Sequence, residues 1–273
     1  MKQAPEAVLH SSCTPGVESR QLHQSLLQKL LPPAFLYRSS TQSRLWLELH
    51  QACSPATNDP ECPQIYIALA QDAWGEIGVE EIVLIGLGCA DGQKETVLLE
   101  QGGGARAAEF LAVDVSASLA QTACQAVLTD SSRAVVLDLA HADDMPGYLG
   151  NLIQSPCRRA ITLFGVLPNL EPGPLLVRVA ELPRPGDLLM LSANLAPGND
   201  YRAGMDIVLP QYDNALTRTW LGQALVELGG DPSRVRLEFT IEIVENQHRI
   251  AADFLFVTSM NLGMEQWKVQ FAA

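Results

Sequence analysis

The stretch "IVLIGLGCADGQKETVLLEQ", residues 82–101, decides the fold of this chain. It begins with an apolar run and passes through three glycines. It ends in a segment whose apolar residues recur at helical spacing. A parallel strand that ends in glycines lets the backbone pass close to a ligand, and the next helix N-terminus offers free N–H groups. The stretch therefore indicates a strand, a tight turn and a helix that hold a nucleotide. An isolated glycine cluster can also be a tight turn with no ligand.

Strand and helix patterns alternate from Glu81 onward, which is typical of a parallel sheet covered on both faces. We expect strands at residues 82–86, 109–114, 133–138, 160–165 and 187–193, and connecting helices at about 92–101, 117–128, 144–154 and 171–181. Two further β patterns, at 234–244 and 249–260, predict an antiparallel C-terminal hairpin. The predicted fold class is α/β, a doubly wound and mostly parallel sheet of seven strands that includes this hairpin.

The flanking segments predict a helical N-terminal cap at residues 1–80 and a nucleotide-binding domain at 81–273. In the cap, leucines at helical spacing stop at Pro32–Pro33, and residues 54–64 form a loop rich in Pro, Asn and Asp. The domain has a substrate-side insertion at about 195–230. Within it, an irregular stretch at 195–211 precedes a long helix at 212–230.

Composition argues against several kinds of partner. The chain has 18 Lys and Arg against 31 Asp and Glu, a net charge of −13, and its longest basic run is Arg158–Arg159, so a nucleic acid would be repelled. No uninterrupted run of about 18 apolar residues occurs, and the N-terminal residues lack the apolar core of a signal peptide. The six cysteines and five histidines are scattered, with no metal-ligand spacing. We therefore expect a cytoplasmic protein with free thiols, without a metal site, and with no membrane or nucleic-acid partner.

Acidic residues stand at the ends of the second and third predicted strands. Asp114 ends the strand in "FLAVDVS", and Asp138 ends the strand in "AVVLDLAHADD". The first of these acids lies at about the distance from the glycines at which an acid binds ribose hydroxyls. Because parallel strands end at one edge of a sheet, we expect polar groups from three successive strands to meet there.

Two classes of nucleotide remain as alternatives for this edge. A nicotinamide or flavin dinucleotide fingerprint would need glycines at 86, 88 and 91, but residue 91 is Asp91 and the third glycine is Gly92. No tyrosine is followed four residues later by a lysine, a pair that one large class of dehydrogenases uses. S-adenosylmethionine is the other option, since acids after the second and third strands can bind its ribose and adenine while its methionine part lies across the glycines.

Several motifs together carry a family resemblance. They are "LGCADGQKE", "AVDVS", "VLDLAH", "ITLFGVLPNLEPG", "RPGDLLMLSANL" and "QYDNALTRTWLGQAL", with "FLYRSSTQSRLWLELHQ" near the N-terminus. In this combination the chain resembles the histidine-specific Nα-methyltransferases of ergothioneine biosynthesis over roughly residues 33–257. The resemblance implies a Rossmann-like, class I methyltransferase fold and S-adenosylmethionine as cofactor.

By this resemblance, specific positions take binding roles. Gly86, Gly88 and Asp114 would contact the cofactor, and Asp138 and Leu139 would lie beside its adenine. The resemblance also places Asn169 and Tyr212 at positions that hold the amino-acid substrate. An amide and a phenol can orient an amino acid without adding charge. Asn169 could instead cap the helix that begins near Glu171, and Tyr212 could be a lid residue packed on the core.

The chain also departs from the family pattern. Leu84 stands where an acid usually anchors the cofactor's methionine part, and the family's lysine falls on Gly92, or on Lys94 if two residues are inserted. "CSPATNDPEC" replaces the family's segment that closes over the substrate. Of the family's C-terminal pair that reads the imidazole, only Glu265 is a weak candidate.

The leading hypothesis is therefore S-adenosylmethionine-dependent methyl transfer to a small molecule, such as an amino acid or another amine. No general base and no catalytic residue is identified. Leu84 motivates a rival hypothesis, a methyltransferase-like protein that binds its ligands without catalysis. A nicotinamide-dependent oxidoreductase is the third alternative.

Overall fold

A computed structural model of the chain describes residues 5–78, 81–101, 106–244, 247–256 and 266–272. The chain folds into two compact units. Unit 1 comprises Met1–Thr14, Ser54–Leu167 and Glu171–Ala193, and unit 2 comprises Pro15–Cys53, Pro168–Leu170 and Asn194–Ala273.

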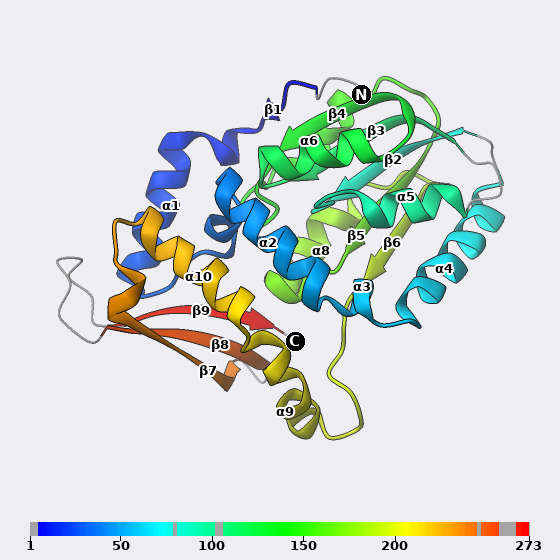
Figure 1. Cartoon of the computed structure of the whole chain (residues 1–273). Helices are drawn as coiled ribbons and strands as arrows, with labels where there is room; N and C mark the ends of the chain where they lie inside the picture. The colour runs from blue at the N-terminus through cyan, green and yellow to red at the C-terminus, as the bar shows by residue number, and fades with distance from the viewer. Residues whose placement is uncertain (1–4, 79–80, 102–105, 245–246, 257–265, 273) are drawn as a thin grey trace. The chain divides into compact units, whose positions relative to one another are not determined.

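Unit 1 is built on a parallel sheet of six strands in the order β1-β4-β3-β2-β5-β6 (Figure 1). The strands are β1 (Val8–Leu9), β2 (Glu81–Leu87), β3 (Arg106–Asp114), β4 (Thr129–Val136), β5 (Arg158–Phe164) and β6 (Leu188–Ser192). From β2 the chain proceeds to β3 and β4 on one side, and then to β5 and β6 on the other. The winding direction reverses between β2 and β5, and in such sheets ligands bind at the carboxyl ends of the strands beside this point. The arrangement is a Rossmann-like, doubly wound α/β fold.

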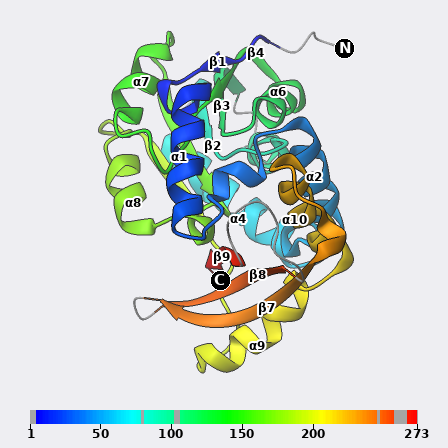
Figure 2. The same ribbon diagram turned by 90° about the vertical axis from the view of Figure 1, so that its left-hand side faces the viewer.

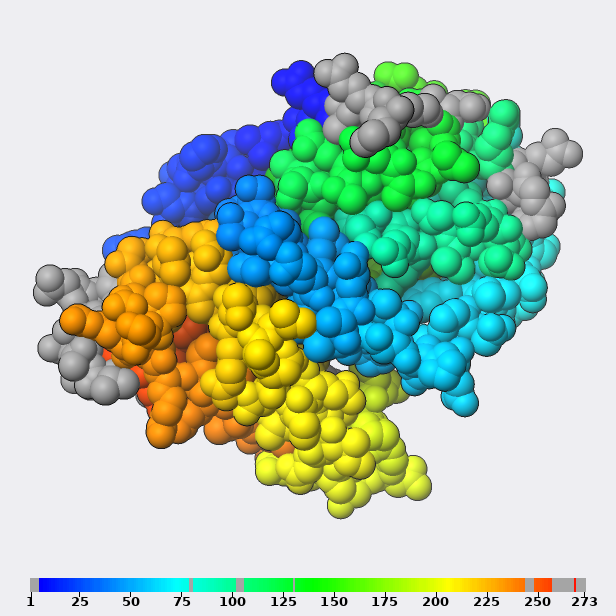
Figure 3. Space-filling view, in the orientation of Figure 1, coloured from blue at the N-terminus to red at the C-terminus, as the bar shows by residue number. Residues whose placement is uncertain are grey.

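Helices cover both faces of this sheet. One face carries α4 (Cys62–Ile77), α5 (Gln93–Glu100) and α6 (Ala117–Ala126), and Figure 3 shows this face of unit 1. The other face carries α7 (Met145–Leu152) and α8 (Pro172–Ala180), which lie beside each other in Figure 2. The inner strands are apolar on both faces, and residues 82–87 are all buried. Their burial explains the continuous apolar runs in the sequence.

The predicted strands and helices of this sheet are confirmed, and three details differ. The two-residue strand β1 was not predicted, because a pattern so short carries no periodicity. The parallel sheet has six strands in the described residues rather than seven. The predicted hairpin is present, but it pairs with β9 (Gln266–Ala272) in a separate antiparallel sheet.

Unit 2 combines that antiparallel sheet with helices from both ends of the chain. The sheet has the order β7 (Val235–Val244), β8 (Gln247–Phe256) and β9. The helices are α1 (Pro15–Leu27), α2 (Ser40–Cys53), α9 (Tyr201–Tyr212) and α10 (Ala215–Glu227), with the short turns η2 (Pro33–Leu36) and η4 (Pro232–Arg234). Its core contains Leu36, Trp220 and Phe254, and the Trp220 Nε1–H donates to the Leu36 carbonyl at 2.9 Å.

The compact units do not follow the predicted boundary at residue 80. Residues 54–78 belong to unit 1 because the apolar face of α4, with Ala70, Trp74 and Ile77, packs on the sheet core. Residues 15–53 belong to unit 2 because α2 contacts α10. A helical pattern shows which face of a helix is apolar, but it does not show which partner that face will meet.

The predicted irregular stretch at 195–211 is wrong in part, because it contains most of helix α9. Asp200 caps this helix by accepting the Ala203 N–H at 3.1 Å. Pro197 and Gly198 precede the helix, and Pro210 lies in its last turn. The predicted loop at 54–64 likewise contains the short helix α3 (Pro55–Asn58) and the first residues of α4.

We expect Gly88→Ala to destabilise the protein. Gly88 has φ +64°, and a Cβ there would lie 2.5 Å from Val166 Cγ2. The left-handed backbone and the overlap together predict a loss of roughly 2–4 kcal/mol in the free energy of unfolding, measured by urea titration. Gly150→Ala in α7 is the matched control, since a Cβ there meets nothing within 4 Å. Equal stability of the two variants would contradict the tight turn.

Candidate functional site

The turn after β2 has a fixed backbone. The N–H groups of Gly88 and Cys89 donate to the Val113 carbonyl of β3 at 2.8 and 3.3 Å. Gly92 has φ +75°, and a Cβ there would lie 3.0 Å from the Cα of Ala123 in α6. Ala90 also has a positive φ, +51°, which is uncommon for a residue with a side chain. The turn is therefore packed against both strand β3 and helix α6.

Asp114 connects this turn to the end of β3. Its Oδ2 accepts the Ala90 N–H at 3.1 Å, and its Oδ1 accepts the Ser116 N–H at 2.9 Å. The side chain is buried, and burial raises the pKa of the carboxyl from 3.8 to about 6, although these backbone N–H groups oppose the shift. Each carboxylate oxygen can accept a second hydrogen bond. This set of acceptors fits two neighbouring hydroxyl groups of a ligand.

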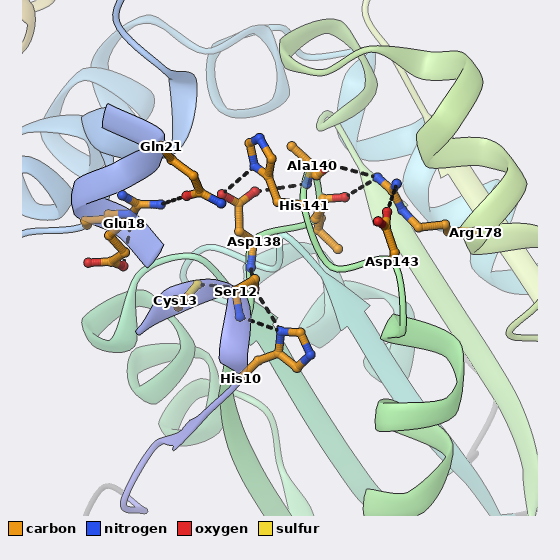
Figure 4. A network of polar contacts seen from close by, with 12 residues as sticks. His10, Ser12, Cys13, Glu18, Gln21, Asp138, Ala140, His141, Asp143 and Arg178 are labelled. Carbon is orange, nitrogen blue, oxygen red and sulfur yellow. Dashed lines mark hydrogen bonds and ion pairs between the residues drawn. The ribbon is translucent and has the colours of Figure 1, made fainter. Parts of the chain in front are cut away.

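Asp138 lies two residues beyond β4, at the same carboxyl edge. Its Oδ1 accepts the Ala140 N–H at 2.9 Å, and its Oδ2 lies 3.0 Å from Nδ1 of His141 (Figure 4). The Asp138 side chain is buried, whereas the His141 side chain is half exposed. The Asp138 carboxylate thus contacts two later residues of the loop after β4. The next residue, Leu139, is buried.

Two groups hold this loop from different sides, as Figure 4 shows. The Asp138 N–H donates to Ser12 Oγ at 3.1 Å, which ties the loop to the segment after β1. Arg178 of α8 donates to the carbonyls of Leu139 and Ala140 at 2.8 and 3.1 Å. Asp138 and Leu139 are therefore set in place by the N-terminal segment as well as by α8.

His10 in turn positions Ser12. Its Nδ1 accepts the Ser12 N–H at 3.1 Å, so a neutral ring carries its proton on Nε2. Nε2 lies 3.0 Å from Oδ1 of Asp144, and Ser12 Oγ lies 2.8 Å from Nδ1. The ring of His10 also meets Tyr148 edge-on, with centroids 4.5 Å apart. No sequence pattern indicated this network, because His10 and Ser12 belong to a short turn after the unpredicted strand β1 and meet the start of α7 only in the folded chain.

Glu95 is a buried acid of the site that the sequence pattern did not reveal. Its Oε1 accepts from Thr162 Oγ1 at 2.7 Å and would lie 3.3 Å from a Cβ on Gly86. Burial raises the pKa of the Glu95 carboxyl. A glutamate in the first turn of a helix is ordinarily explained by the helix dipole, so its spacing is no sign of burial. Helix α5 therefore places a carboxyl group beside Gly86, while Leu84 of β2 is a core residue.

Asn169 and Tyr212 belong to unit 2, whereas the glycines, Asp114 and Asp138 belong to unit 1. Helix α8 begins at Pro172 with Glu171 at its N-cap, so Asn169 does not cap it. Tyr212 ends α9 and packs against the cluster of Ala196, Met205 and Ile250, and burial raises the pKa of its phenol. The proposed cofactor residues thus lie together in one unit, and the two proposed substrate residues lie in the other. Glu265 lies outside the described residues.

Metal-binding and membrane-spanning features are absent from the part of the chain that the structure describes. There, no group of three or more His, Cys, Asp and Glu residues could hold a metal ion. No helix in the same ranges is long and apolar enough to cross a membrane.

Comparison with known proteins gives similarities of fold. No protein-family model and no curated protein matches the chain. The chain is similar to the plantazolicin methyltransferase BpumL in complex with SAH, with 9% sequence identity and a TM-score of 0.44. The match covers 82% of this chain and 83% of the BpumL chain. The magnesium protoporphyrin IX methyltransferase ChlM from Synechocystis PCC 6803 with bound SAH is 14% identical, with coverages of 80% and 96% and a TM-score of 0.42. At these values the similarities do not assign an activity to the chain.

We expect Asp114→Asn to change how stability depends on pH. Because the folded pKa of about 6 lies above the ordinary 3.8, the Asp114 contribution to stability is complete below pH 3.8 and is lost as pH rises through 6. Between pH 4 and 7 the variant should therefore gain stability relative to the wild type, on the order of 3 kcal/mol at most. Urea unfolding of both proteins across this range measures the difference. A pH-independent difference would contradict the raised pKa.

We expect Ser12→Ala to loosen the loop after β4. The substitution removes the acceptor of the buried Asp138 N–H, which predicts a loss of about 1–3 kcal/mol in the free energy of unfolding. Hydrogen exchange should show faster exchange of the Asp138 amide. The neighbouring exposed Ser11→Ala is the control, with an expected change within about 0.5 kcal/mol. Unchanged exchange at Asp138 in Ser12→Ala would refute the role of this contact.

Proposed function

We propose that this chain is an S-adenosylmethionine-dependent methyltransferase that acts on a small molecule. The observation that carries the proposal is the carboxylate of Asp114, which is bound to the turn after β2 and still has acceptor capacity for two hydroxyl groups. It lies beside the point where the sheet reverses its winding, the usual place of a nucleotide in such folds. These residues fit the ribose of the cofactor.

The other cofactor contacts follow the same edge of the sheet. Gly86 and Gly88 line the turn that would pass along the methionine part, and Asp138 and Leu139 would lie beside the adenine. Glu95 offers a carboxyl near Gly86 for the cofactor's ammonium group. It would replace the acid that the family has at the position of Leu84. A bound cofactor supplies a methyl group that its sulfonium already activates. The protein then needs to orient the acceptor and exclude water, and orientation alone can be worth about 10⁵–10⁸ M in effective molarity.

The acceptor is, in this proposal, an amino acid or another amine. The proposal assigns its binding to Asn169 and to Tyr212, which lies in the substrate-side segment at about 195–230. Asn169 supports this role because α8 has its N-cap elsewhere, and because the amide makes no hydrogen bond to any described residue. Histidine, the acceptor implied by the family resemblance, is the first amino acid to test. An amine must reach the methyl group in its neutral form.

A second candidate function is ligand binding without catalysis. Leu84, at the position of the family's acidic anchor, is fully buried in the core and cannot bind a charged group. If that loss is not compensated by Glu95, the cofactor would bind weakly or without turnover. The two candidates differ in whether methyl transfer follows binding.

Isothermal titration with S-adenosylmethionine and S-adenosylhomocysteine tests the proposal directly. We expect binding to the wild type and a loss of about 10- to 100-fold in affinity for Asp114→Ala, because two hydrogen bonds to a charged group disappear. Asp72→Ala, an exposed carboxylate in α4 of the same unit, should bind as the wild type does.

Activity assays then separate the candidates. Methyl transfer from labelled S-adenosylmethionine to a panel of amino acids and amines, with histidine included, supports the enzyme. Binding without transfer to any of them favours the non-catalytic candidate. Absence of binding to both ligands at millimolar concentration overturns the proposal, and binding of NADH in their place would support the oxidoreductase.

A further inference from the structure

We infer that His10 is a positioning residue of the proposed cofactor site, which acts through Ser12 on the loop of Asp138 and makes cofactor affinity depend on the protonation of its ring. The inference deepens the proposed function, on which it rests for the identity of the ligand. Three contacts form the path: from α7 to His10, from His10 to Ser12, and from Ser12 to Asp138.

The imidazole ring of His10 caps the short helical turn η1 (Ser11–Cys13). Its Nδ1 accepts the Ser12 N–H at 3.1 Å, and Ser12 Oγ lies 2.8 Å from the same nitrogen. The usual capping side chains are those of Asn, Asp and Ser, and none of them changes charge near neutral pH. A histidine makes the cap depend on pH, because a protonated Nδ1 is a donor and cannot accept.

The position of the ring is fixed by its surroundings. The His10 side chain is buried, its Nε2 lies 3.0 Å from Oδ1 of Asp144, and it meets the Tyr148 ring at an interplanar angle of 70°. The His10 N–H donates to the Val136 carbonyl at the end of β4 at 2.9 Å. Strand β4 and helix α7 therefore hold the residue from two sides, and its Nδ1 stays directed at Ser12.

Ser12 connects the ring to the cofactor edge, as Figure 4 shows. Its Oγ accepts the Asp138 N–H at 3.1 Å. With a neutral ring, the Ser12 hydroxyl donates to Nδ1 and its oxygen accepts from Asp138. With a proton on Nδ1, the bond between the two side chains reverses, and the Ser12 N–H faces another donor at 3.1 Å. Protonation therefore leaves a buried N–H without its acceptor and favours a displacement of Ser12.

A displacement of Ser12 reaches both acids that we assign to the cofactor. Asp138 is bonded to Ser12 directly, and the Leu137 N–H next to it donates to the Asp114 carbonyl at 2.9 Å. The backbone that carries the proposed adenine and ribose contacts thus depends on one hydroxyl group. We therefore expect cofactor affinity to fall when the ring of His10 is protonated.

Several charged or titratable groups surround the ring and Ser12. They are Asp144 at the N-cap of α7, Tyr148 in α7, Asp138 after β4, and Cys13 in η1, whose Sγ lies 3.7 Å from Ser12 Oγ. Burial and Asp144 raise the pKa of the Tyr148 phenol, although Arg133 of β4 opposes the shift, so the phenol stays neutral near pH 7. The Asp144 side chain is 71% exposed, so solvent and salt screen its charge. Imidazole is thus the group on this path that changes charge near neutral pH.

Calorimetric titration of S-adenosylhomocysteine at pH 8 and at pH 5.5 tests the inference, with His10→Asn as the central variant. The asparagine amide oxygen can accept the Ser12 N–H, and it does not titrate. We expect His10→Asn to bind as the wild type does at pH 8, and about 10-fold more tightly than the wild type at pH 5.5. Asp114 and His141 are present in both proteins, so any pH dependence that they cause cancels in the comparison.

Two further variants complete the set. His10→Leu fills similar space without an acceptor, and should weaken binding about 10-fold at pH 8. His23→Asn replaces an exposed histidine of α1 and is the matched control, which should leave the pH dependence of affinity unchanged.

Measurements without ligand separate the positioning role from the proposed function. The ¹⁵N signals of the His10 ring in the wild type give the pH at which it is protonated. Hydrogen-exchange protection of the Asp138 amide should fall with the same midpoint, and should not fall in His10→Asn. The amide of Ile85, buried in β2, reports on global unfolding and serves as the internal reference.

Each outcome decides one of the two proposals. If the wild type and His10→Asn show the same pH dependence of affinity, the inference is overturned. If neither S-adenosylhomocysteine nor S-adenosylmethionine binds but Asp138 protection follows the protonation of His10, the methyltransferase proposal fails and the positioning role of His10 in this loop stands. If Asp138 protection in the wild type does not follow that protonation, the inference is overturned even if His10→Asn does not fold.

Discussion

A buried carboxylate needs hydrogen-bond donors, and Asp114 takes them from the turns after β2 and β3. This requirement fixes the carboxyl edge of the sheet. It brings the Ala90 N–H toward β3 and holds Ala90 at a positive φ. The glycines on both sides of Ala90 accommodate the same tight path, with Val166 and Ala123 in contact range. The backbone path of the turn and the negative charge beside it therefore depend on the same residue, Asp114.

The chemistry of this edge depends on which element supplies each charge. Strand β2 carries the buried Leu84 two residues before Gly86, so the strand supplies no charge there. Helix α5 instead provides Glu95 and Lys94 in successive positions, and their side chains reach Thr162 and Phe164 of β5.

Unit 2 illustrates a different limit of sequence reasoning. The patterns of α2, α10 and the hairpin were readable one at a time, since each has an apolar face of the correct period. Their assembly was not, because Leu36, Trp220 and Phe254 are far apart in the sequence and meet only in the folded core. The hairpin was expected to join the parallel sheet, but the strand it pairs with is β9, for which no strand was predicted.

The sequence by itself determined the doubly wound sheet, the glycine turn after β2 and the acids at the ends of β3 and beyond β4. Those features depend on local periodicity and on residue types with special backbone freedom, and both can be read in one dimension. Only the tertiary structure decided that Glu95 is buried beside Gly86, that Ser12 holds the loop of Asp138, and that Lys94 reaches the end of β5. Burial and hydrogen bonding between distant residues follow from packing, and a sequence pattern does not contain the partner.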